Sequence, residues 1–173
     1  QGTAGLELME QAAVLGTLPE IVLVPCSGGG LASGVALAVK AANPAAHIYA
    51  VEPAGFDDMA RSLTSGKHER NAKLSGSICD ALLAPSPGVI TFELARRLLT
   101  GSIAVTDEEV RAAIRFAYYE LKLVLEPGGA IALAAVLARR IDTAGRTVAC
   151  VLSGGNIDPA LFSEIVLEAG APA

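Results

Sequence analysis

Residues 21–31 read IVLVPCSGGGL, an apolar strand that breaks into three glycines and then opens a helix. Glycine tolerates positive φ angles and lets backbone N–H groups come close to an anion. The helix that follows directs about half a positive charge at the same place. A tight turn that only packs helix on strand is the alternative, but three glycines in a row cost chain entropy. The stretch therefore predicts a site for a phosphorylated ligand at Gly28–Gly30.

Length and composition predict one soluble domain over residues 1–173. A chain of 173 residues, 52% of them hydrophobic, buries roughly 70% of its unfolded surface in a single core. The longest uncharged run, residues 21–39, is broken by Pro25 and the glycines, so no membrane helix is expected. The net charge is −5 and the nine arginines and four lysines are scattered. Nucleic acid and anionic membranes are therefore excluded as expected partners.

The cysteines and the first residues bear on compartment and completeness. Cys26, Cys79 and Cys150 have no CxxC spacing, so neither a zinc site nor a disulfide framework is predicted, and the cytoplasm is the expected location. The chain begins at Gln1 without an initiator Met and enters a helical pattern almost at once. We expect it to be part of a longer protein, and the tail after Gly170 to fray.

Apolar spacing and turn formers predict alternating strands and helices. A strand, a helix and a second strand between residues 21 and 51 form a βαβ unit, which implies a parallel sheet. Thr106 and Glu109 match a capping box at the start of a helix. The expected helices span residues 6–14, 31–42, 58–63, 87–99, 106–125, 130–140 and 159–167, with Pro87 in a first turn, and the expected strands span 21–24, 47–51, 103–105 and 147–152, the last one buried.

A second glycine turn, Ser153-Gly154-Gly155-Asn156, follows the last expected strand. Ligands of open α/β sheets bind outside the carboxyl ends of the strands, and both glycine turns fall at such ends. The two turns are therefore expected to face one pocket. The alternative is that Ser153 only caps the final helix, and the motif alone leaves both interpretations open.

A dinucleotide-binding fold of an oxidoreductase is a rival interpretation. Residues 28–33 miss the G-x-G-x-x-G pattern only at the last position, and Glu52 ends the second strand where a ribose-binding acid would lie. Against this rival, Pro53, a turn and two further acids, Asp57 and Asp58, follow Glu52. A non-catalytic binding or assembly domain is the third class.

Five segments carry a likeness when they are taken together and in order: residues 25–34, Glu52-Pro53 with Asp57-Asp58, 77–82, 123–130 and 152–158. They resemble the fold-type II pyridoxal phosphate enzymes, and within them the threonine/serine dehydratases, with serine racemase as a close relative. The resemblance implies a three-layer α/β fold with a mostly parallel sheet and helices on both faces, similar to the large domain of tryptophan synthase β-like enzymes but incomplete.

The resemblance also implies cofactor contacts. Ser153 would place its hydroxyl on the pyridine nitrogen, which leaves that nitrogen unprotonated and suits β-elimination. Glu126 would lie beside the ring, or would instead be a solvent-facing cap. The 5′-phosphate would accept backbone N–H bonds from Ser27, Gly28, Gly29, Gly30 and Leu31.

A metal loop is implied by the same resemblance. The carboxylates of Glu52 and Asp58 with the carbonyl of Phe56 would give hard oxygen ligands, which suit Mg²⁺ or Ca²⁺. Some members of the family carry this ion and others do not. The alternative is that Asp57 or Asp58 caps the following helix.

The family's Schiff-base lysine has no counterpart in this chain. None of the four lysines stands in the Ser-x-Lys context that the family uses; they are Lys40, Lys67, Lys73 and Lys122. The chain thus resembles the carboxyl-terminal half of a dehydratase that converts L-threonine or L-serine to a 2-oxo acid and ammonia. A racemase-type isomerase is the alternative within the family. The lysine and the small domain would lie in a missing amino-terminal half, so the chain alone is predicted to be inactive, and the whole enzyme to be a homo-oligomer, dimer or tetramer.

Overall fold

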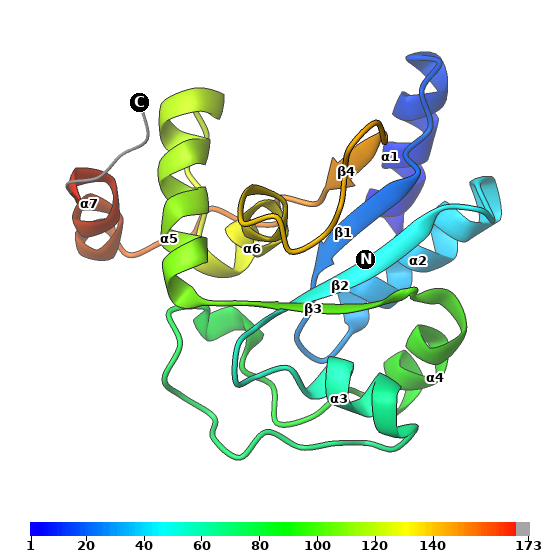
Figure 1. The fold of residues 1–173 in the computed structure, drawn as a ribbon, viewed down its shortest axis with the longest axis horizontal. Helices are drawn as coiled ribbons and strands as arrows, with labels where there is room; N and C mark the ends of the chain where they lie inside the picture. Colours follow the sequence, from blue (N-terminus) through cyan, green and yellow to red (C-terminus); the bar gives the residue numbers. More distant parts are fainter. Residues whose placement is uncertain (169–173) are drawn as a thin grey trace.

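The computed structural model describes residues 1–168, which form an α/β fold around a four-stranded sheet (Figure 1). The strands lie in the order β3-β2-β1-β4 and every neighbouring pair is parallel. The predicted βαβ unit is confirmed, with β1 (Ile21–Pro25) paired to β2 (His47–Pro53) across α2 (Gly30–Ala42). The tail after Gly170, expected to fray, lies outside the described residues.

The central strand β1 is buried on both faces, as a continuous apolar run in a parallel sheet requires. Successive side chains point to opposite faces. Ile21 and Leu23 join one hydrophobic core, whereas Val22 and Val24 join the other. The sheet therefore separates two cores, one on each face.

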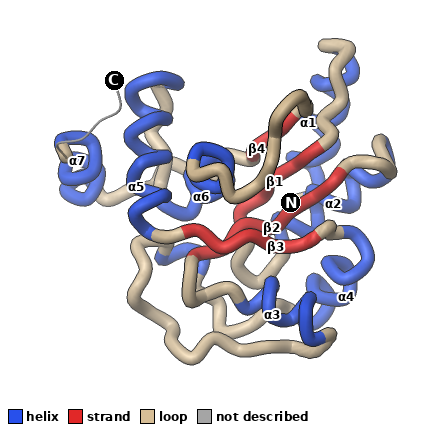
Figure 2. Tube along the Cα trace, in the orientation of Figure 1, coloured by secondary structure: helices blue, strands red, loops and turns tan. Residues whose placement is uncertain are grey.

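Helices cover both faces of the sheet, as Figure 2 shows. On one face α2 packs on β1, with α1 (Gly2–Val14) and α4 (Val89–Leu98) against it. On the other face α6 (Pro127–Leu137) packs on three strands, with α5 (Asp107–Phe116) and α7 (Pro159–Leu167) outside it. The predicted three-layer arrangement is confirmed.

Two helix predictions are wrong at their ends. The helix that opens at the capping box does not reach residue 125: α5 stops at Phe116, a π-helical turn follows, and Lys122 adopts a left-handed φ of 60° that ends the helix. Pro87 does not lie in a first helical turn, because Gly88 is the residue that caps α4.

Two further predictions near the carboxyl-terminal half also differ. The helix predicted over residues 130–140 begins and ends earlier, because Pro127 and the two glycines form the first turn of α6, which ends at Leu137. Glu126 lies outside the helix, in the break before it. The last strand is shorter than expected and only partly buried, since β4 (Val148–Cys150) lies at an edge of the sheet.

The remaining bounds follow the expected order along the chain. Among residues 1–168 no helix combines the length and the apolar character that a bilayer crossing needs. The elements not yet given are α3 (Asp58–Ser65), a 3₁₀ turn (Asp80–Leu82), β3 (Gly101–Val105) and the π-helical turn (Ala117–Leu121).

Candidate functional site

The first glycine turn lies between the carboxyl end of β1 and the start of α2. Gly29 caps the helix with a left-handed φ of 90°, a conformation that favours glycine. A Cβ added at Gly28 or Gly30 would meet no atom within 4 Å. The turn thus leaves open space in front of a helix N-terminus, which is the arrangement that suits a phosphate group.

The second glycine turn leaves the same edge of the sheet. β4 lies beside β1 with Leu23 opposite Cys150, and the Val151 N–H donates to the Leu23 carbonyl oxygen at 2.9 Å. Because the two strands are parallel neighbours, the segments that follow them emerge side by side. The Ser27–Gly30 and Ser153–Asn156 turns therefore open at one edge, as a shared pocket requires.

Glu126 joins the second turn. Its N–H donates to the Gly154 carbonyl at 3.0 Å, and its Oε2 accepts from the Asn156 N–H at 3.1 Å. A Cβ at Gly154 would come within 2.7 Å of Glu126 Oε1, and the positive φ of 153° at Gly154 disfavours any residue with a side chain. Glu126 precedes α6, but its side chain makes no cap hydrogen bond. The carboxylate faces the Ser153 turn and does not cap the helix.

Ser153 does not cap the final helix. The cap of α7 is Asp158, whose Oδ1 accepts from the N–H groups of Ala160 and Leu161 at 2.9 and 3.0 Å. Ser153 is exposed at the edge where the two turns emerge. The capping alternative is therefore wrong, and the Ser153 side chain lies free of α7.

A third segment, residues 82–91, contacts the first turn and the start of α6, and sequence reasoning did not place it there. Leu82 lies 3.2 Å from where a Cβ of Gly128 would be, and the Ala84 N–H donates to Ser27 Oγ at 3.2 Å. The Gly88 N–H donates to the Gly28 carbonyl at 3.0 Å. The turn formers at residues 85–88 were the only local signal, and they do not say which partner the turn contacts.

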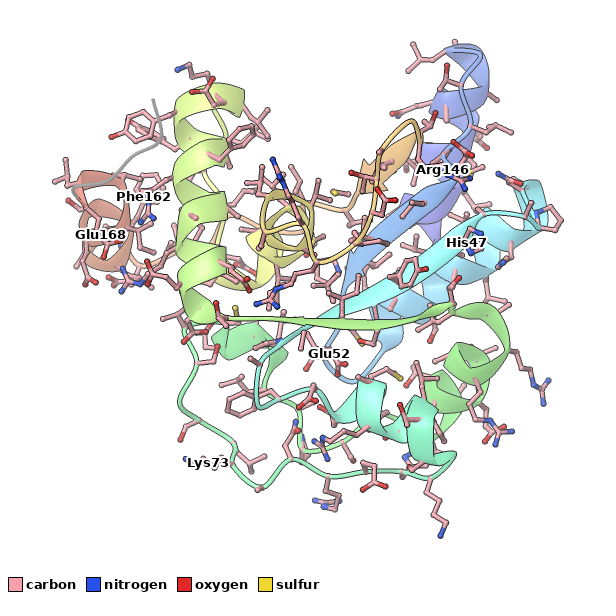
Figure 3. All side chains as sticks on the ribbon, viewed as in Figure 1. His47, Glu52, Lys73, Arg146, Phe162 and Glu168 are labelled. Carbon is pink, nitrogen blue, oxygen red and sulfur yellow. The ribbon has the colours of Figure 1, made fainter. Side chains whose placement is uncertain are left out.

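Glu52, which Figure 3 labels, accepts three hydrogen bonds. Its Oε1 accepts from the Met59 N–H at 2.8 Å, and its Oε2 accepts from the Ala60 N–H at 2.9 Å and from Ser102 Oγ at 2.7 Å. The side chain is fully buried, and this burial raises its pKa to about 7 although the three hydrogen bonds oppose the shift. Glu52 thus caps α3 from within the core, and a carboxylate so buried does not suit the ribose contact of the dinucleotide interpretation.

Asp58 lies next to Glu52, and one of its two carboxylate oxygens has no hydrogen-bond partner. Oδ1 accepts from Asn71 Nδ2 at 2.6 Å, whereas Oδ2 is buried without a hydrogen-bond partner. Burial raises the pKa of Asp58, against the bond from Asn71 that lowers it. An orphaned buried oxygen suits a cation, but Glu52 offers its oxygens to N–H and O–H donors, so the loop fits an ion only in part. Within residues 1–168 no group of three His, Cys, Asp or Glu side chains is arranged to hold a metal.

The four lysines lie on three parts of the chain: α2, the loop after α3 and the end of the π-helical turn. Lys40 Nζ donates to the carbonyls of Pro44 and Ala46 and stands roughly 15 Å along α2 from Gly30, at 1.5 Å per residue. Lys122 Nζ donates to the Tyr119 carbonyl. Lys67 and Lys73 are exposed on the loop after α3, where Figure 3 labels Lys73.

The comparisons with known proteins agree on one family. The family model for pyridoxal-phosphate dependent enzymes matches residues 1–154. The chain is 39% identical to an L-threonine ammonia-lyase of Thermotoga maritima, over 96% of this chain and 40% of that protein. It is 36% identical to a serine racemase of Dictyostelium discoideum, over 96% of this chain and 51% of that protein. The chain thus spans about half the length of the curated relatives it matches.

Solved structures agree with this comparison. A threonine deaminase from T.th. superposes with a TM-score of 0.86 at 42% identity, over 91% of this chain and 52% of that one. A maize serine racemase superposes with a TM-score of 0.84 at 38% identity, over 94% of this chain and 51% of that one. The similarity covers nearly all of this chain in sequence and in fold.

Proposed function

The chain belongs to the pyridoxal-phosphate dependent enzymes, and we propose that it is the carboxyl-terminal half of an ammonia-lyase acting on L-threonine or L-serine. The observation that carries the proposal is the meeting of two glycine turns at one edge of the sheet, with open space at Gly28 and Gly30. The resemblance to threonine ammonia-lyases at 39% identity supports the reaction class.

We give the residues the roles that the family resemblance implies, and their placement at one edge of the sheet supports these roles. Backbone N–H groups from Ser27 to Leu31, with the positive end of α2, hold the phosphate. Ser153 offers a neutral hydroxyl to the ring nitrogen, and Glu126 fixes the turn that carries Ser153. When bound, pyridoxal phosphate supplies the electron sink for proton removal and loss of the β-hydroxyl. The lysine and the substrate-binding loop belong to the other half.

A serine racemase activity is the second candidate, because serine racemases are 35–40% identical to this chain. Both reactions begin by loss of the Cα proton. The products separate them: a dehydratase yields a 2-oxo acid and ammonia, whereas a racemase yields D-serine. The residues that would decide lie outside this chain in our proposal.

Ligand titration of the chain tests the cofactor assignment. We expect pyridoxal 5′-phosphate to bind and to shift the amide resonances of Gly28, Gly29 and Gly30, because the phosphate lies against them. Pyridoxal, which lacks the phosphate, is the matched control and should bind at least tenfold more weakly. Binding of NADH in preference to pyridoxal phosphate, or equal binding of pyridoxal, would overturn the assignment.

For the acidic loop we propose a Mg²⁺ or Ca²⁺ ion at Asp58 Oδ2, with the Phe56 carbonyl and Glu52 as further ligands. The orphaned oxygen supports the ion, and the hydrogen bonds of Glu52 mean that this side chain must exchange partners to join it. After chelator treatment, the thermal unfolding temperature should rise when either ion is added. An unchanged unfolding temperature at millimolar ion would rule the site out.

We also propose a cellular compartment and an oligomeric state. The three cysteines of residues 1–168 are free, which suits a reducing cytoplasm. We expect the complete enzyme to be a homodimer or homotetramer. Sedimentation of the complete enzyme checks this, and a monomer would contradict it.

A further inference from the structure

The first glycine turn is braced from behind by residues far along the chain. The Gly28 carbonyl accepts two hydrogen bonds, from the Gly88 N–H at 3.0 Å and from Thr91 Oγ1 at 2.5 Å. Thr91 lies in the first turn of α4, 63 residues beyond Gly28. The turn and the amino-terminal end of α4 are therefore held together.

Packing at Gly29 shows how close this contact is. A Cβ at Gly29 would lie 2.8 Å from Met59 Cε and 3.0 Å from Thr91 Oγ1. By contrast, a Cβ at Gly28 or Gly30 would meet open space. The turn thus has a filled side, formed by Thr91 and Met59, and an open side available to a ligand.

The hydroxyl of Thr91 has one hydrogen and two nearby acceptors. Gly28 O is at 2.5 Å and Gly88 O is at 3.0 Å, so the shorter contact is made to the glycine turn. A peptide unit is planar, and holding its carbonyl oxygen also fixes the direction of its N–H. The bond from Thr91 to Gly28 therefore fixes the Gly28–Gly29 peptide plane before any ligand arrives.

A neighbouring bond provides a comparison. Ser33 Oγ, on the buried face of α2, donates to the Thr91 carbonyl at 3.0 Å. This bond ties α2 to α4 at the same residue but does not touch the glycine turn. Its loss should weaken the helix contact and leave the peptide plane of Gly28 in place.

We propose that Thr91 is a positioning residue for the phosphate group of the ligand. It makes no contact with the ligand itself and acts by holding Gly28. The inference rests on the proposed function, since that function supplies the phosphate. Preorganising a binding loop raises affinity because less ordering remains to be done on binding.

The test compares three variants of the chain. Thr91→Val keeps the shape and removes the donor, Thr91→Ser keeps the donor, and Ser33→Ala removes only the neighbouring bond. The probes are pyridoxal 5′-phosphate and inorganic phosphate, with amide spectra of the ligand-free chain and thermal unfolding as further measurements. We expect Thr91→Val to weaken binding of both probes about threefold to tenfold, the effect of one hydrogen bond.

The remaining results separate positioning from general stability. In Thr91→Val the ligand-free amide resonances of Gly28 and Gly29 should shift, and Thr91→Ser should restore both resonances and affinity. Ser33→Ala should lower the unfolding temperature and leave affinity within twofold. Equal affinity of Thr91→Val and wild type, or equal weakening by Ser33→Ala, would overturn the role of Thr91. If the wild type binds neither probe, the proposed function itself fails.

Discussion

Among single residues, the buried Glu52 makes the stability of the fold depend on pH. Burial raises its pKa from 4.5 to about 7 in the folded chain, whereas in the unfolded chain it titrates near 4.5. Its contribution to stability is complete below the unfolded pKa and is lost as the pH rises toward 7.

Glu52→Gln should remove this dependence. The amide side chain cannot ionise, so the free energy of unfolding of the variant should fall less than that of the wild type between pH 4.5 and 7. Urea unfolding at several pH values, in the presence of a chelator, measures the difference. Glu93→Gln, a change at the exposed partner of Arg96 on α4, serves as the control. Parallel curves for wild type and Glu52→Gln would contradict the prediction.

The same titration addresses the acidic loop as an ion site. A bound cation favours the ionised form of Glu52 and Asp58. With Mg²⁺ or Ca²⁺ in place of the chelator, the wild type should therefore keep its stability at pH 7, and Asp58→Asn should not. If the ions leave the wild-type curve unchanged, Glu52 acts only as the internal cap of α3.

Among the helices, α5 is stabilised at its first turn by the predicted capping box. Thr106 Oγ1 accepts from the Glu109 N–H, and Glu109 Oε2 accepts from the Thr106 N–H at 2.7 Å. Burial alone would raise the pKa of Glu109, but the bond from Thr106 and the ion pair with Arg140 outweigh it and lower that pKa. The capping box therefore stabilises α5 fully above the ordinary pKa of a glutamate, and this stabilisation is lost as the pH falls through the lowered pKa of Glu109.

Thr106→Ala should destabilise the chain by about 1 kcal/mol at neutral pH, the usual effect of losing a side-chain cap. Urea unfolding measures it. Thr64→Ala removes an exposed hydroxyl that bonds back to Ala60 within α3, and its effect should stay within about 0.5 kcal/mol. A Thr106→Ala effect no larger than that of the control would show that the box does not stabilise α5.

For the molecule as a whole, our proposal puts cofactor binding at one edge of the sheet and the reactive lysine outside this chain. Both glycine turns and Glu126 gather at the carboxyl ends of β1 and β4, and Lys40 lies at the far end of α2. The chain spans about half the length of its curated relatives. We therefore expect this chain to bind the cofactor without turning over substrate.

Accordingly, the chain with added pyridoxal phosphate should produce no 2-oxo acid from L-threonine or L-serine. Borohydride reduction followed by mass spectrometry should find no adduct confined to a single lysine. Turnover above a chain-free control, or trapping at one lysine, would contradict the assignment of the lysine to the other half. The Thermotoga maritima L-threonine ammonia-lyase provides the positive control.

Features that neighbouring residues encode could be predicted from the amino-acid sequence. The apolar run before Gly28, the capping box at Thr106 and the final helix from Pro159 to Leu167 were all predicted and are confirmed. Each depends on hydrogen bonds or side-chain periodicity within a few residues. The early end of α5 was missed because a left-handed Lys122 has no clear local signal.

Contacts between distant residues became known from the folded structure. It placed β4 beside β1, so that the two glycine turns share an edge, and it brought Ala84, Gly88 and Thr91 against the first of them. It also placed the donors of Met59, Ala60 and Ser102 around Glu52. Contacts such as those of Thr91 and Ser102 join residues 50 or more apart, and they depend on strand order and helix packing, which no local pattern of residues specifies.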